Sequence, residues 1–183
     1  MTRNKANDVL KLVLAALFAA LICVATMVVR SPMPATDGYA NLGDAIILIS
    51  AFLMPPYLAA AAAGIGSMLA DLLAGYAEFA PGTFIIKAAV AFIAGNILFR
   101  FGKEKGVFSS LPVMVIAGVV AECAMVLGYF AYEALILSYG MGAAGSLLGN
   151  VGQGVVGVVV SCTVTPLLMR NTEVKNMMAK TWK

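Results

Sequence analysis

The chain has 183 residues, of which 62% are hydrophobic and only 11% are charged. A soluble domain is typically about half apolar and a quarter charged, so a water-soluble fold of this length could not bury so much apolar surface. The composition therefore predicts an integral membrane protein. The net charge is only +3, and the basic residues gather near the ends and in one loop, which favours membrane orientation over nucleic-acid binding.

Metal-binding and disulfide motifs are lacking in the sequence. There is no histidine, and the three cysteines, Cys23, Cys123 and Cys162, lie far apart in apolar runs. We interpret them as small packing residues, and we expect no metal site. No GxxxxGK[ST] pattern occurs and no nucleophile–base set is evident, so we expect neither an ATP site nor an enzyme.

Apolar runs separated by breakers predict six membrane spans within a single transmembrane domain, residues 1–183. The spans cover residues 9–29, 43–54, 57–75, 83–101, 111–138 and 146–169. The first run follows basic residues, as a signal peptide would, but it is long enough to cross a bilayer, and we interpret it as a transmembrane helix. The second run is short for a full crossing, so it is expected to tilt or to begin deep beneath the preceding loop.

The positions of the basic residues predict the orientation. They form three clusters: Arg3, Lys5 and Lys11; Arg100, Lys103 and Lys105; and Arg170, Lys175, Lys180 and Lys183. With six spans all three clusters fall on one side, which the positive-inside rule makes cytoplasmic. Five spans would put the later clusters on opposite faces. The predicted fold is therefore an all-α membrane protein of six helices with both termini in the cytoplasm.

Polar side chains inside the spans indicate a pocket. Ionisable and amide residues within spans are Asp44, Asp71, Lys87, Glu122, Glu133, Asn150 and Gln153. Such residues are expensive in lipid and usually face the bundle interior or a cavity. Most of them lie in the outer half of the bilayer. An ion pathway would instead place polar groups through the full thickness of the bilayer. Tyr39, Asn41, Tyr76 and Tyr129 lie at the same level and complete the candidate substrate-binding set, with Tyr39 and Asn41 in a loop that could form a lid.

Small and polar residues recur along these spans at helical spacing. Ser67 and Asp71 share one face, and Thr83 and Lys87 share another, so each helix has a face unsuited to lipid.

Structural roles are the alternative for each of these polar residues. Asp71 and Lys87 could pair with each other as a lock between two helices. Glu122, alone near mid-membrane, could be a protonated packing residue, and Asn150 and Gln153 could form hydrogen bonds between helices. Packing alone does not require the set to gather on the outer side, so the cluster is stronger evidence than any member.

The first span carries two pairs of small residues at helical spacing. Ala15 pairs with Ala19, and Ala16 pairs with Ala20, on a helix without charges in this stretch. Such a face could approach a partner helix closely, although lipid-facing alanine is the simpler reading.

Three stretches of the sequence resemble a known family. "YANLGDAIILISAFLMPP", "GIGSMLADLLAGYAEFAPGTFIIKAAVAFIAG" and the "AALFAAL" of the first helix resemble substrate-binding S components of energy-coupling factor (ECF) vitamin transporters, and the closest members are the riboflavin-type proteins that include hydroxymethylpyrimidine and pyridoxine transporters. The resemblance implies six helices and a substrate site near the extracellular face. It also implies docking on a transmembrane coupling protein through Ala15, Ala16, Ala19 and Ala20.

The expected function follows from the pocket and the resemblance together. It is binding of a small water-soluble vitamin or precursor, pyridoxine or hydroxymethylpyrimidine-like, for import through a prokaryotic cell membrane. The chain itself needs no cofactor, because the resemblance assigns ATP to two cytoplasmic ATPase partners. The alternative is an ion-coupled secondary carrier of a small polar metabolite, although inverted repeats and broken helices are not evident. A lipid-modifying enzyme and a ligand-free scaffold are more distant alternatives.

Overall fold

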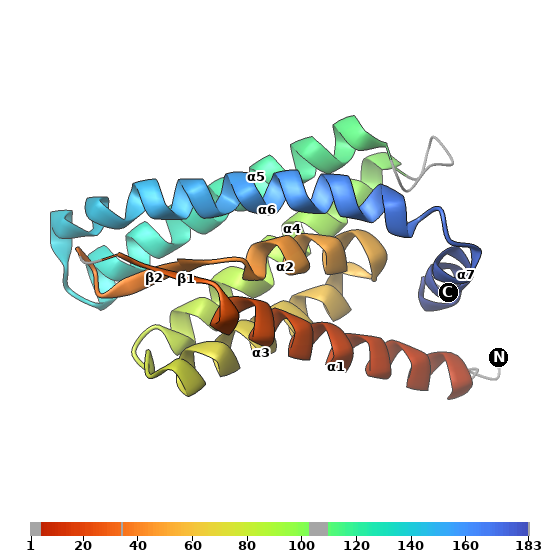
Figure 1. Cartoon of the computed structure of the whole chain (residues 1–183), viewed down its shortest axis with the longest axis horizontal. Helices are drawn as coiled ribbons and strands as arrows, with labels where there is room; N and C mark the ends of the chain where they lie inside the picture. The colour runs from red at the N-terminus through yellow and green to blue at the C-terminus, as the bar shows by residue number, and fades with distance from the viewer. Residues whose placement is uncertain (1–4, 34, 103–109, 183) are drawn as a thin grey trace.

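The computed structural model describes residues 5–33, 35–102 and 110–182 (Figure 1). The elements in chain order are α1 (Lys5–Val28), β1 (Arg30–Met33), β2 (Gly38–Asn41), α2 (Gly43–Leu53), α3 (Pro56–Ala74), α4 (Ala80–Gly102), α5 (Leu111–Ala131), the π-helical turn η2 (Tyr132–Ile136), the 3-10 helix η3 (Gly140–Ser146), α6 (Leu147–Leu168) and α7 (Thr172–Thr181).

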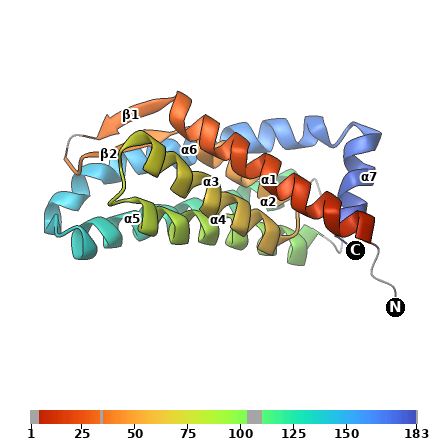
Figure 2. The ribbon, with the colours of Figure 1, turned by 90° about the horizontal axis from the view of Figure 1, so that it is seen from below.

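The long helices form one bundle, and this all-α membrane architecture is the predicted one. In the described part of the chain, five helical stretches are long and apolar enough to cross a membrane: α1, α3, α4, α5 with η2, and η3 with α6. Figure 2 shows α3 and α4 side by side, and α1 packs against α3. Many large apolar side chains, such as Leu12, Leu73 and Leu148, point outward, as lipid contact requires.

Helix α2 lies inside the bundle, not on its surface. All of its residues except Ile46 are buried. Its 11 residues rise only about 16 Å, roughly half the thickness of the hydrocarbon core. The antiparallel hairpin of β1 and β2 precedes it, and the hairpin and α2 extend one after the other along the bundle (Figure 1). The second predicted span is therefore a short helix that begins deep beneath a loop.

The two ends of the bundle differ in chemistry. The start of α1, the end of α4 and helix α7 lie at one end, and the hairpin lies at the other (Figure 1). The described basic residues of the predicted clusters belong to the first of these ends, and most of the polar residues predicted for the pocket belong to the elements at the hairpin end. Arg3, Lys103, Lys105 and Lys183 lie outside the described residues.

Small residues let α3 approach its two neighbours closely. A Cβ atom on Gly66 would lie 2.4 Å from the carbonyl oxygen of Ala19 in α1, and one on Gly64 would lie 2.9 Å from the carbonyl oxygen of Phe84 in α4. Because a backbone oxygen cannot swing away as a side chain can, these contacts admit only glycine.

Replacing Gly66 tests this packing. We expect Gly66→Ala to lower the free energy of unfolding by about 1–3 kcal/mol, because the added methyl group forces α1 and α3 apart. The measurement is the thermal unfolding midpoint of the purified protein in detergent. Gly152→Ala is the matched control, since a Cβ atom on exposed Gly152 would have no neighbour within 4 Å. Equal midpoints for the two variants would contradict the close approach.

Candidate functional site

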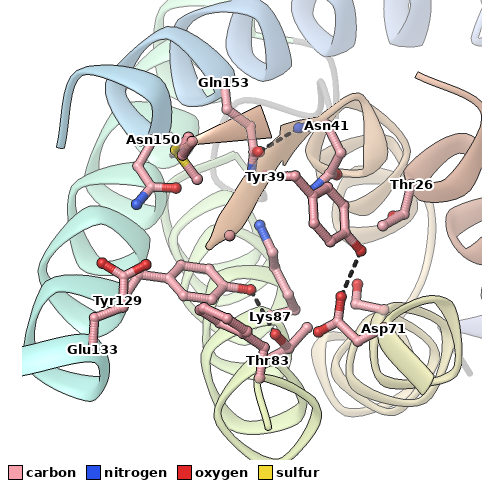
Figure 3. A pocket seen from close by; sticks show the side chains of 14 residues that line it. Thr26, Tyr39, Asn41, Asp71, Thr83, Lys87, Tyr129, Glu133, Asn150 and Gln153 are labelled. Carbon is pink, nitrogen blue, oxygen red and sulfur yellow. Dashed lines mark hydrogen bonds between the residues drawn. The ribbon is translucent and has the colours of Figure 1, made fainter. Parts of the chain in front are cut away.

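A cavity lies at the hairpin end, enclosed by α1, the hairpin and the outer ends of α3, α4, α5 and α6 (Figure 3). Its wall includes these residues of the predicted set: Tyr39, Asn41, Asp71, Lys87, Tyr129, Glu133, Asn150 and Gln153. The structure thus brings together side chains from six separate elements that the sequence analysis grouped by depth and helical face.

Other wall residues were not in the predicted set: Thr26, Met33, Gly38, Ser67, Phe79 and Thr83. Ser67 and Thr83 stand on the same small polar faces as Asp71 and Lys87, so helical spacing could have identified them. Met33 and Gly38 line the cavity because the hairpin folds over it, whereas Thr26 lies on α1 and Phe79 lies just before α4. No local sequence pattern predicts that these four residues meet.

Three residues of the predicted set do not line the cavity. Asp44 is fully buried behind Lys87. Tyr76 packs on the ring of Tyr39, with 4.7 Å between ring centroids. Glu122 lines a separate groove between α5 and α6. Direct ligand contact by these three side chains stays a prediction.

Lys87 and Asp44 form a buried ion pair beneath the cavity. Lys87 Nζ donates to both carboxylate oxygens of Asp44, at 2.7 and 2.8 Å, and the two side chains are 2% and 1% exposed. The alternative in which Lys87 pairs with Asp71 is wrong, because the partner of Lys87 is Asp44 on α2. The ammonium has three hydrogens, of which Asp44 takes two, and it also lies 5.2 Å from the ring centroid of Tyr129.

Gln153 connects this ion pair to the hairpin. Its Oε1 accepts a hydrogen bond from the backbone N–H of Asn41 at 2.6 Å, and its Nε2 donates to Asp44 Oδ2 at 2.5 Å. The amide therefore has its oxygen toward a donor and its nitrogen toward a carboxylate, the orientation that satisfies both. The end of β2, α6, α2 and α4 are joined in one polar chain.

Tyr39 fastens the other side of the hairpin. Its hydroxyl donates to Asp71 Oδ1 at 2.5 Å, so that β2 is tied to α3 (Figure 3). Burial and the adjacent Asp71 carboxylate raise the pKa of Tyr39 well above its ordinary value, and the phenol remains a hydrogen-bond donor at neutral pH. The guanidinium of Arg30 lies 5.8 Å from the centroid of the ring.

A π-helical turn helps form the wall at the end of α5. The turn η2 contains Glu133, which is 1% exposed and accepts a hydrogen bond from Ser146 Oγ. Such turns commonly occur at functional sites, since they change the direction in which a helical side chain points. Here the turn places the Glu133 carboxylate in the cavity wall.

Several polar atoms at the cavity lack partners in the described chain. Thr26 Oγ1, Ser67 Oγ and Asp71 Oδ2 are buried and form no hydrogen bond. Asn150 Nδ2 has only one long bond, of 3.4 Å, to Ser146 Oγ. Buried polar groups are nearly always paired, so these atoms fit a polar molecule.

The hairpin closes the cavity. The free volume of the cavity is only about 20 Å³, enough for about one water molecule. Small-molecule sites are typically several hundred cubic ångströms. A ring-sized molecule would therefore fit only after the hairpin or its side chains move.

These features define a multi-pass membrane protein with a polar cavity beneath a hairpin at one end. The family model of the ECF-type riboflavin transporter S component matches residues 6–170, and the chain belongs to this family. It is 30% identical over 165 residues to "Thiamine precursor transporter HmpT" of Lactococcus lactis, with 90% of each chain covered. It is 33% identical over 139 residues to an uncharacterized protein of Pyrococcus woesei, covering 76% of this chain and 88% of the relative.

The family settles the broad class of function. The chain is a substrate-binding subunit of a vitamin or vitamin-precursor transporter, and it is not an enzyme. It is a multi-pass protein of the prokaryotic plasma membrane. The family membership predicted from the resemblance is confirmed.

Removing the lysine tests the ion pair. We expect Lys87→Met to lower the free energy of unfolding by about 3–5 kcal/mol, because it leaves the Asp44 carboxylate buried without a counter-charge. The double variant Lys87→Met/Asp44→Asn should recover most of this loss, since no charge then remains in the pair. Thermal unfolding of both variants is the measurement. A single variant as stable as the wild type would show that the pair does not hold the bundle together.

Proposed function

We propose that the chain is the substrate-specific subunit of an ATP-driven ECF importer, and that its cavity binds a small polar ring compound, a pyridoxine or a hydroxymethylpyrimidine-like vitamin precursor. The observation that carries this proposal is the closed cavity whose wall combines aromatic rings with unpaired polar atoms. The similarity to a relative named as a thiamine precursor transporter supports the same substrate class.

The cavity wall offers complementary chemistry for such a ring. The third hydrogen of the Lys87 ammonium and the amide of Asn150 can donate to ring nitrogens or hydroxyls. The carboxylates of Asp71 and Glu133 can accept from hydroxyl or amino groups. The rings of Tyr129 and Tyr39 provide apolar faces, and pockets of this kind typically combine an apolar wall with a few placed polar groups.

Access to the cavity requires that the hairpin opens. Two side-chain hydrogen bonds hold its β2 strand down, Tyr39 to Asp71 and Asn41 to Gln153. A net hydrogen bond contributes only about 1 kcal/mol, so these two permit opening at modest cost. The hairpin is then a lid that closes over the bound molecule.

The exposed small residues of α1 are the proposed docking face for the coupling protein. Ala16 and Ala20 are exposed, whereas Ala15 and Ala19 are half-buried. The carbonyl of Ala19 packs where Gly66 of α3 has no side chain. The structure therefore favours the Ala16–Ala20 pair for a partner helix, and two ATPases would drive the assembly.

Ligand binding is tested first. The purified protein should retain a small polar ring compound identifiable by mass spectrometry, and pyridoxine and hydroxymethylpyrimidine should be titrated separately. We expect Asn150→Ala to weaken binding by about tenfold or more with an unchanged unfolding midpoint, because Asn150 has almost no internal bonding. Asn96→Ala, which removes a half-buried amide that donates to the backbone carbonyl of Phe92, is the matched control. Unchanged affinity in Asn150→Ala would argue against this site.

Docking is tested by placing bulk on α1. Ala16→Trp and Ala20→Trp should abolish co-purification with the coupling protein and ATPases while ligand affinity stays at the wild-type value, because helices that meet at small residues cannot accommodate an indole. Ala61→Trp, at another exposed alanine on α3, should leave co-purification intact. Substrate uptake into liposomes by this chain alone would overturn the ATP-driven assignment.

A further inference from the structure

An apolar groove on the lipid-facing side of the bundle, between α5 and α6, has an acidic residue in its wall. Its lining is valine-rich, with Val119, Val126, Val155 and Val158 among its residues, and Glu122 is the one acidic residue there in the described chain. Glu122 lies 11 residues after the start of α5, or about 16 Å along the helix, near the middle of a bilayer about 30 Å thick. It is only 5% exposed.

The Glu122 carboxyl is buried against glycines of α6. A Cβ atom on Gly154 would lie 3.2 Å from its Oε2, and one on Gly157 would lie 3.4 Å from its Oε1. The same Gly157 position is 3.2 Å from Asp44 Cβ, so the two acidic side chains meet at one point of α6. Neither oxygen of Glu122 has a hydrogen-bond partner in the described chain.

The charges around Glu122 do not balance if the carboxyls of Glu122 and Asp44 are both ionised. Asp44 on α2 and Lys87 on α4 are the charged groups that interact with it, and α6 presents glycine. One ammonium then faces two carboxylates. Lys87 and Gln153 donate to Asp44, whereas nothing donates to Glu122. An uncompensated charge in an apolar interior is far more expensive than a neutral acid.

We propose that Glu122 is a proton-binding site that is reached from the lipid side of the bundle. Its carboxyl group is held as a neutral acid, and its proton keeps the cluster of Asp44, Lys87 and Glu122 free of net charge. The site is distinct from the cavity, and it does not depend on which substrate the cavity binds. It also gives Glu122 a role other than ligand contact.

An apolar carbodiimide is the direct probe. Dicyclohexylcarbodiimide dissolves in the bilayer and reacts with protonated carboxyls: the acid oxygen bonds to the central carbon, the acid proton moves to nitrogen, and the resulting ester rearranges to a stable acylurea. Wild-type protein in phosphatidylcholine nanodiscs at neutral pH should gain one adduct, at Glu122, located by peptide mass spectrometry. The exposed carboxylates Glu78 and Glu173 are internal controls that should stay unmodified. Absence of an adduct at Glu122 would overturn the proposal.

A second variant tests whether the neighbouring charges keep Glu122 protonated. In Asp44→Asn, Glu122 becomes the counter-ion of Lys87 and should lose its proton, so labelling at Glu122 should fall by about tenfold or more. In Lys87→Met/Asp44→Asn the acid should stay neutral and labelled. Undiminished labelling in Asp44→Asn would contradict the proposed charge balance.

Infrared spectroscopy gives a readout that needs no reaction. The wild type should show the carbonyl stretch of a protonated carboxylic acid, and Glu122→Gln should lack it while the unfolding midpoint remains close to that of the wild type. Identical spectra of the two proteins would overturn the proposal, whatever the outcome for the Asp44 variants.

Discussion

The ion pair between Lys87 and Asp44 is the interaction on which the arrangement of the bundle depends. A charge inside the bilayer is tolerated only when it is paired and shielded from lipid, and α2 provides both conditions. It is short and buried on nearly all sides, so Asp44 at its start meets Lys87 in the interior. The chain enters α2 directly from the hairpin, and so the position of the ion pair fixes where the lid is attached.

The hairpin and the ion pair form one polar network. Gln153 contacts the backbone of Asn41 on one side and Asp44 on the other. A movement of the hairpin would therefore remove the donor to Gln153 Oε1, and the amide oxygen would need another hydrogen-bond donor. The geometry therefore couples the position of the hairpin to the orientation of the Gln153 amide beneath it.

Much of the fold and part of the site follow from local patterns in the sequence. Spans are visible because lipid demands long apolar runs, and the polar faces of α3 and α4 are visible because Asp71 and Lys87 recur with small residues at helical spacing. The partner of Lys87 was not visible, since it depends on how α2 packs. The loop before α2 contains a two-stranded hairpin, and the predicted fifth and sixth spans end or begin in π and 3-10 turns. Such features are set by tertiary contacts and not by periodicity.

Selectivity at this site would depend less on how many hydrogen bonds a ligand forms than on which existing hydrogen bonds it replaces. The closed lid already occupies one oxygen of Asp71 and the amide of Gln153, and a bound ring must either leave these bonds in place or replace them. A gained bond contributes little when a similar bond is lost, whereas a buried donor or acceptor left unpaired is expensive. A molecule that satisfies Thr26, Ser67 and the free oxygen of Asp71 without disturbing the lid bonds is therefore favoured over one of equal size that disturbs them. For the proposed ring ligand, the unpaired atoms of the wall would then discriminate more than the cavity volume does.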